Sequence, residues 1–306
     1  MKDVTIHWNK AMNIIKLSVG TGPIYLVSPS VFEAAALKRP PYYQNKGTPM
    51  FYAVCPRCDN PVEIVGLYKR IQPYARHHPK DIPGLAQYSQ EAYNFCPYAK
   101  PQKPNPQERK KIRTGLPMQI LKLLHEQFDR VIYILTKDTG IIFSEQLAEQ
   151  MLTRYLAGEG YLYPWATLAN LPWIFGHLSH RWNLWGRVIR KDSALRTVLA
   201  SHGQLLFDGK GQLRTVPGKF VDINFLFMKH RLHTEHTEKD MEYAGGSLKE
   251  TLDFVVTGGN GKKPEILYKK TLNIDQGYFL HLINLPEEKA RRNQKLLEIA
   301  KTLITT

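Results

Sequence analysis

The chain has 306 residues and a net charge of +15, with 43% apolar and 23% charged residues, an ordinary composition for a globular protein. It contains no run of eighteen apolar residues, which excludes a membrane-spanning helix, and its amino terminus lacks the apolar segment of a secretory signal. Three cysteines are an odd number and do not favour a disulfide framework. We therefore expect a cytoplasmic protein of two or three folded regions.

The positive charge is concentrated in the first third of the chain. Residues 1–113 hold 17 basic and 7 acidic side chains, a balance of +10, whereas the other 193 residues hold 25 and 20, a balance of +5. A basic field of this kind attracts phosphate polyanions and makes their binding salt-dependent. This asymmetry favours contact with nucleic acid over the alternative that the charge only keeps the protein in solution.

Residues 3–27 alternate apolar and polar positions and predict a β-hairpin that turns at 20–23. Within residues 28–39 Ser30 is expected as the N-cap of a short helix that follows it, and the helix should end at the two prolines 40–41.

All three cysteines lie between residues 55 and 96. Cys55 and Cys58 form a C-P-x-C pair between the β-prone segments FYAV and PVEIVGLY, which predicts a strand, a tight turn and a second strand. Tetrahedral zinc bound by this pair needs two more ligands. Cys96, at the end of an expected helix, is the third, and either His77 or His78 is the fourth. With His77, the favoured choice, the spacing is C-x2-C-x18-H-x18-C.

A Cys3His shell is a closed, structural site without an open position for a substrate water. We expect one Zn²⁺ per chain, holding together a module of about residues 50–100 that has little core of its own. The alternative is three unpaired thiols. The combination of C-P-x-C, a later Arg-His-His and a returning Cys-Pro resembles, over about fifty residues, the zinc modules of many bacterial nucleic-acid-processing proteins.

Three prolines make residues 100–107 a predicted linker. A helix is expected over 108–128, a buried strand over 130–136, and a second helix over 144–158 with Ser144 as its N-cap.

Residues 161–187 hold four of the five tryptophans. Large rings dominate protein cores, which predicts that these aromatic residues fill a helical middle domain. In the alternative, some of them stack on bases beside Arg187 and Lys191.

The rest of the chain predicts strands over 219–228, 251–259 and 264–274 and a closing helix over 286–304. We therefore expect an α+β protein in three parts: a β-rich N-terminal region with the zinc-knuckle module (1–100), an aromatic-rich helical middle domain (108–203), and a mixed strand and helix section (204–306).

Motifs for catalysis are incomplete. A metal-dependent nuclease would need an acidic pair such as Asp253 and Glu265, but the lysine expected two residues after Glu265 is a leucine. His230, His233 and His236 could bind a metal or act as a base, and more often such a cluster is a polar turn. Nucleotide-binding and nucleophile motifs are missing, so a non-enzymatic role is favoured.

The sequence thus predicts a zinc-stabilised, basic protein that binds DNA or RNA through phosphates within a larger nucleoprotein system, without membrane contact. One alternative is a docking subunit of a multiprotein assembly, and another is a diverged metal-dependent nuclease. The predicted phosphate-binding residues are basic side chains near the metal, after the linker and in the aromatic region: Lys69, Arg70, Arg76, Lys80, Arg109, Lys110, Lys111, Arg113, Arg187 and Lys191.

Overall fold

The computed structural model describes residues 12–45, 47–99, 104–111, 113–235, 247–259, 264–289 and 291–304. The chain forms two compact units, one of Met1–Pro104 with Leu232–Lys249, and the other of Asn105–Arg231 with Glu250–Thr306. Apart from 232–249, the regions predicted as 108–203 and 204–306 both lie in the second unit. Helices and antiparallel sheets confirm the predicted α+β class.

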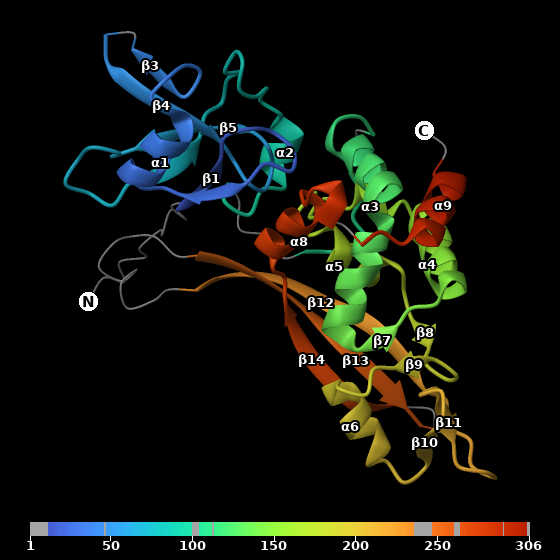
Figure 1. Cartoon of the computed structure of the whole chain (residues 1–306). Helices are drawn as coiled ribbons and strands as arrows, with labels where there is room; N and C mark the ends of the chain where they lie inside the picture. The colour runs from blue at the N-terminus through green and yellow to red at the C-terminus, as the bar shows by residue number, and fades with distance from the viewer. Residues whose placement is uncertain are drawn as a thin grey trace, which may run out of the picture. The chain divides into compact units, whose positions relative to one another are not determined.

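The first unit is built on an antiparallel sheet in the order β2-β1-β4-β5-β6, with β3 paired to β4 (Figure 1). Its core includes Phe32, Val62 and Ile64 together with all three cysteines. The elements are β1 (Ile14–Lys16), β2 (Ile24–Leu26), α1 (Pro29–Ala36), β3 (Tyr43–Asn45), β4 (Pro49–Val54), β5 (Pro61–Val65), β6 (Tyr74–His77) and α2 (Gln90–Asn94).

Strands β1 and β2 form the predicted hairpin, of which residues 3–11 lie outside the described part of the chain. The predicted N-cap of α1 is wrong by two residues. Ser28, not Ser30, caps the helix: its hydroxyl accepts a hydrogen bond from Val31 N at 3.4 Å, and Pro29 occupies the first helical turn, where a missing N–H costs nothing.

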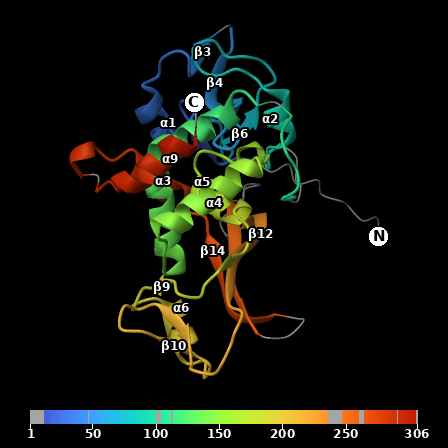
Figure 2. The same ribbon diagram turned by 90° about the vertical axis from the view of Figure 1, so that its right-hand side faces the viewer.

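In the second unit, helices α3, α4, α5 and α9 lie together, and the sheet of β14-β13-β12-β8 lies beside them (Figures 1 and 2). Its helices are α3 (Leu116–Thr139), α4 (Glu145–Ala157), α5 (Leu171–Leu178), α6 (Ala194–Ala200), α8 (Gln276–Ile283) and α9 (Gln294–Leu303), with the short 3-10 helices η1 (Gly160–Leu162) and η2 (Glu287–Lys289). Its strands are β7 (Ile141–Ile142), β8 (Trp182–Asn183), β9 (Val188–Ile189), β10 (Leu205–Phe207), β11 (Leu213–Thr215), β12 (Asn224–Glu235), β13 (Ser247–Gly258) and β14 (Glu265–Asn273). Residues 232–235 of β12 and 247–249 of β13 belong to the first unit.

The strand predicted over 130–136 is wrong, because this apolar segment is the second half of α3. A buried strand and a helix that is covered on several sides have the same apolar run. Here α5 and α9 both contact α3. The predicted helix capped by Ser144 is confirmed as α4.

Three of the four clustered tryptophans, Trp165, Trp173 and Trp182, are buried, as the core interpretation predicts. Trp185 is the exception at 45% exposure, with the Arg214 guanidinium 5.1 Å from its ring. None of the helices in the described residues is both long and apolar enough to cross a membrane.

Candidate metal centre

The first two cysteines lie in a tight turn between β4 and β5. The turn is closed by two backbone hydrogen bonds, from Asp59 N to Cys55 O (3.1 Å) and from Cys55 N to Asn60 O (2.9 Å). Asp59 takes the left-handed conformation (φ 58°) that such a turn requires and that aspartate tolerates. This geometry is the predicted strand, knuckle and strand, and it brings the side chains of Cys55 and Cys58 to one side.

Cys96 reaches the same point because α2 is tied to the knuckle. The Asn60 side chain accepts a hydrogen bond from Ser89 N (2.6 Å) and donates one to Ser89 O (3.0 Å). Ser89 is also the N-cap of α2, and its hydroxyl accepts from Ala92 N at 3.2 Å. The start of the helix is thereby fixed, and its end delivers Cys96 two residues later.

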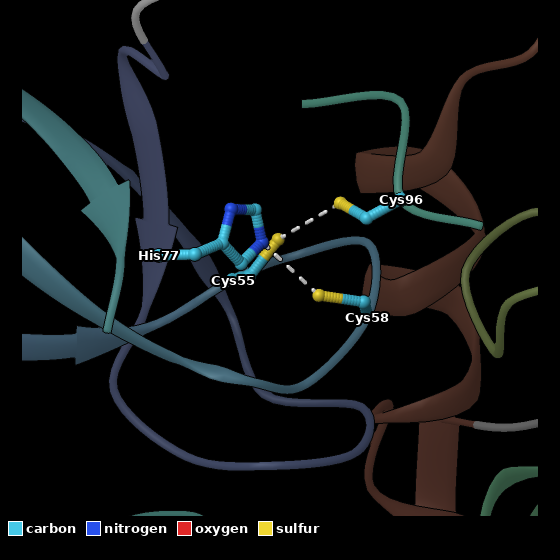
Figure 3. Close-up of side chains that lie close together, drawn as sticks. All are labelled: Cys55, Cys58, His77 and Cys96. Atoms are coloured by element: carbon cyan, nitrogen blue, oxygen red, sulfur yellow. Dashed lines mark hydrogen bonds between the residues drawn. The ribbon is translucent and has the colours of Figure 1, made fainter. Parts of the chain in front are cut away.

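The histidine is His77 and not His78. Successive side chains of a strand point to opposite faces. His77, the last residue of β6, directs its Nε2 to 3.2 Å from the Cys58 sulfur, as Figure 3 shows. The ring of His78 instead packs edge-on against Tyr52.

The four donor atoms fit a tetrahedral metal ion. They all lie within 4.8 Å of one another, and the sulfurs of Cys55 and Cys96 are 3.7 Å apart. Two sulfurs bound to one zinc at about 2.3 Å in a tetrahedron are separated by about 3.8 Å. The cysteines are buried and His77 is half-buried. The cluster can therefore hold one metal ion, with every tetrahedral position taken by a side chain.

The surroundings of the thiols act in opposite directions on the pKa values of Cys58 and Cys96. Burial opposes ionisation and raises the pKa of Cys58. Burial acts on Cys96 too, but hydrogen bonds from the other two cysteines and from the backbone of Tyr98, together with the charge of Arg57, hold its pKa well below the usual range. In both Cys-Pro turns the backbone N–H two residues after the cysteine donates a hydrogen bond to its sulfur. Arg57 N lies 3.5 Å from Cys55 Sγ, and Tyr98 N donates to Cys96. Amides near sulfur are typical of thiolate metal sites.

A buried ion pair fastens the β1–β2 hairpin to the knuckle. Lys16 Nζ pairs with the Asp59 carboxylate and donates to Gly20 O at 2.6 Å, while Gly20 N donates to Asp59 at 3.1 Å. Sequence reasoning missed Lys16, Asp59 and Asn60. The Asp-Asn after the second cysteine is a turn signal that could have identified the latter two.

The predicted phosphate-binding residues of the first unit are on its surface. Lys69, Arg70 and Lys80 are exposed, and no acidic side chain in the described part of the chain forms an ion pair with them. Arg76 is exposed too, but pairs with Glu63 at 2.9 Å.

In the second unit two of the predicted phosphate-binding residues, Arg109 and Arg113, have intramolecular partners. Arg109 donates to the carbonyl oxygens of Gly158 (2.9 Å) and Pro106 (2.7 Å), and Arg113 pairs with Glu159 at 2.7 Å. Lys110 is buried and Arg187 is half-buried, whereas Lys111 and Lys191 are exposed. The guanidinium groups of Arg109 and Arg113 are therefore engaged within the second unit.

The acidic pair considered for a nuclease does not converge. Asp253 faces Thr271 across the β13–β14 ladder, whereas Glu265 faces Gly258 at the far end of the same ladder. Asp253 is 1% exposed, and its carboxylate accepts from Arg231 (2.9 Å) and pairs with Lys269 (3.1 Å). The hydrogen bonds from Arg231 hold the pKa of Asp253 well below its usual range. This carboxylate is already occupied by the two cations Arg231 and Lys269.

Of the predicted histidine cluster, His236 and the side chain of His233 lie outside the described residues. His230 is buried, and its Nε2 donates to Glu250 at 2.7 Å. Glu250 also accepts from Asn170 (2.7 Å) and Gln276 (2.6 Å), and the Tyr163 hydroxyl is 3.0 Å from His230 Nδ1. These residues form a polar network inside the second unit, not the solvated turn that the sequence favours.

His177 lies beside this network. Its lowered pKa predicts that the second unit loses stability in acid. Burial lowers its pKa to about 4, with a further contribution from His230, although its Nδ1 donates to Phe227 O at 3.0 Å. The unfolded chain binds this proton near pH 6.5 and the folded chain only near pH 4. The contribution of neutral His177 to the free energy of unfolding is therefore fully present above pH 6.5. It falls by about 3 kcal/mol between pH 6.5 and 4.

Urea unfolding of the second unit measured across this pH range tests the prediction. His177→Gln should remove most of the loss, and an unchanged pH profile in that variant would contradict it. The matched control is His202→Gln, at a half-buried histidine whose Nδ1 accepts a 3.4 Å hydrogen bond from Gln204 N.

Comparison with models of protein families, with curated proteins and with solved structures found no match to this chain.

Proposed function

We propose that this is a non-enzymatic, zinc-stabilised protein of the cytoplasm, whose basic first unit binds nucleic acid through its phosphates. The observation that carries the proposal is the convergence of Cys55, Cys58, His77 and Cys96 on one point. The predicted alternative of a docking subunit in a larger assembly stays a prediction.

Zinc is the metal that this donor set favours. Three sulfurs and one imidazole in a tetrahedral arrangement select zinc over magnesium and calcium, which take oxygen ligands. The cysteines are free thiols and lie in the hydrophobic core of the unit, where a bound ion would tie β4, β6 and the end of α2 to one point. A reducing compartment keeps such thiols available to the metal.

Nucleic acid is supported by charge and exposure. The first unit, residues 1–104 with 232–249, holds 15 basic and 10 acidic side chains, a balance of +5, and the side chains of Lys69, Arg70 and Lys80 are exposed to solvent. Cations placed in this way contact phosphates without reading bases. Arg109 and Arg113 of the second unit have intramolecular partners, which leaves Lys69, Arg70 and Lys80 of the first unit as the better candidates.

The test is a binding titration of the zinc-loaded full chain against single-stranded and duplex oligonucleotides, DNA and RNA, between 50 and 300 mM salt. We expect micromolar or tighter binding at low salt and an affinity that falls linearly with salt on logarithmic axes, with a slope of about −2 to −4 for three to five phosphates. Failure to bind any of the four nucleic acids at low salt would overturn the proposal.

A further inference from the structure

The loop between β5 and β6 displays an aromatic ring beside two cations. Tyr68 is 54% exposed, Ile71 is 50% exposed, and Lys69 and Arg70 are exposed between them. A tyrosine ring is costly to leave in water, and a ring next to unpaired positive charge is the pattern with which proteins hold a nucleotide chain.

The loop has a fixed shape. Gly66 has φ +78°, and a Cβ placed on it would lie 2.5 Å from the Ile71 side chain, so the close approach of Ile71 requires glycine there. Leu67 is buried in the core, and Lys69 N donates to Gly66 O at 3.0 Å. The tip that carries Lys69 and Arg70 is therefore anchored on both sides.

The ring of Tyr68 is also held in place. Its hydroxyl donates to the Glu33 carboxylate at 2.6 Å and lies 3.1 Å from the hydroxyl of Tyr43. Phe51 lies between the two tyrosine rings, with its centroid 5.2 Å from Tyr43 and 5.3 Å from Tyr68. A ring ordered before binding loses little entropy when a ligand stacks on it.

The charge around this ring is favourable to an anion. Glu33, the acidic neighbour of Tyr68, is already paired with Lys38 at 2.9 Å. Arg39 is exposed next to that pair, and Lys69 and Arg70 have no acidic partner in the described part of the chain. The two cations that follow Tyr68 in the loop are therefore available to pair with an anion.

We propose that Tyr68, Lys69 and Arg70 form a contact site for single-stranded nucleic acid, in which an unpaired base stacks on the exposed ring of Tyr68 and the adjoining phosphates pair with the two cations. The site rests on the proposed function and specifies its substrate. In a duplex the base faces are stacked on their neighbours and are closed to a side chain, whereas a single strand offers them freely. Stacking accepts any base, so the site recognises strandedness and not sequence.

The experiment compares variants of the zinc-loaded full chain on a labelled single-stranded oligonucleotide, with the duplex of the same sequence as competitor. Tyr68→Leu should weaken single-strand binding about tenfold, whereas Tyr68→Phe, which keeps the ring, should stay within about twofold. Lys69→Gln with Arg70→Gln should reduce the salt slope by about 1.4. The matched control is Lys295→Gln with Lys301→Gln on α9, which makes the same change in charge at two exposed lysines.

Metal content and circular dichroism of each variant establish that its first unit is folded. If the parent chain binds single strands but Tyr68→Leu binds them equally well, or if the duplex competes as strongly as the single strand, this inference is wrong and the proposed function stands. If the parent chain binds no nucleic acid, the proposed function fails and this inference with it.

Discussion

Replacing Cys96 with serine is expected to abolish metal binding and to unfold the first unit. A structural zinc site contributes about 10–16 kcal/mol to the folding of a small module, which equals or exceeds the 5–15 kcal/mol by which whole domains are stable. Cys96 lies in the core of the unit, and the sulfur that it loses is 3.7 Å from that of Cys55. Metal analysis, with amide exchange measured over residues 50–99, should show loss of the ion and of protection in that segment.

The two adjacent histidines provide the matched pair of variants. His77→Ala should behave like the Cys96 variant, because His77 Nε2 is one of the four donors. His78→Ala removes a ring that packs on Tyr52 and should keep a full equivalent of metal. A chain that keeps its metal and its protection after His77→Ala would contradict this assignment of the ligand.

Replacing Glu250 with alanine is expected to destabilise the second unit by about 3–5 kcal/mol, because it removes a buried carboxylate and leaves several buried hydrogen-bond donors without an acceptor. The side chains of His230 and Glu250 are 1% and 3% exposed. Asn170 and Gln276 donate to the same carboxylate, and water has no direct access to replace it. Chemical denaturation of the second unit, followed by tryptophan fluorescence, measures the loss.

A surface glutamate shows whether the effect is due to the network. Glu149 lies exposed on α4, and Glu149→Ala should change stability by no more than about 0.5 kcal/mol. The account of the network fails if the Glu149 and Glu250 variants unfold at the same denaturant concentration.

The metal centre could be predicted to the extent that its geometry is local. A two-residue gap between cysteines in a turn fixes their mutual placement, so Cys55 and Cys58 could be identified as a pair. The choice between His77 and His78 depends on which face of β6 points to the turn that carries Cys55 and Cys58. That face is set by the pairing of Val62 with His77. The local sequence around the two histidines does not predict which residues of a neighbouring strand they pair with.

The remaining differences also come from long-range contacts. The buried pair of Lys16 and Asp59 joins residues 43 positions apart, and neither position alone signals a partner. Residues 130–136 have the composition of a strand and become helical because α5 and α9 cover them. His230 was expected in a polar turn, but it is buried and hydrogen-bonded to Glu250. Burial decided by tertiary packing overrides local pattern at these positions.

The most direct test of the proposed zinc centre is X-ray absorption at the zinc edge, with metal stoichiometry, on the full chain purified without added metal. One zinc per chain is expected, bound by three sulfurs at about 2.3 Å and one nitrogen at about 2.0–2.1 Å. A chain with less than about a tenth of an equivalent of metal, or a zinc surrounded mainly by oxygen, would contradict it.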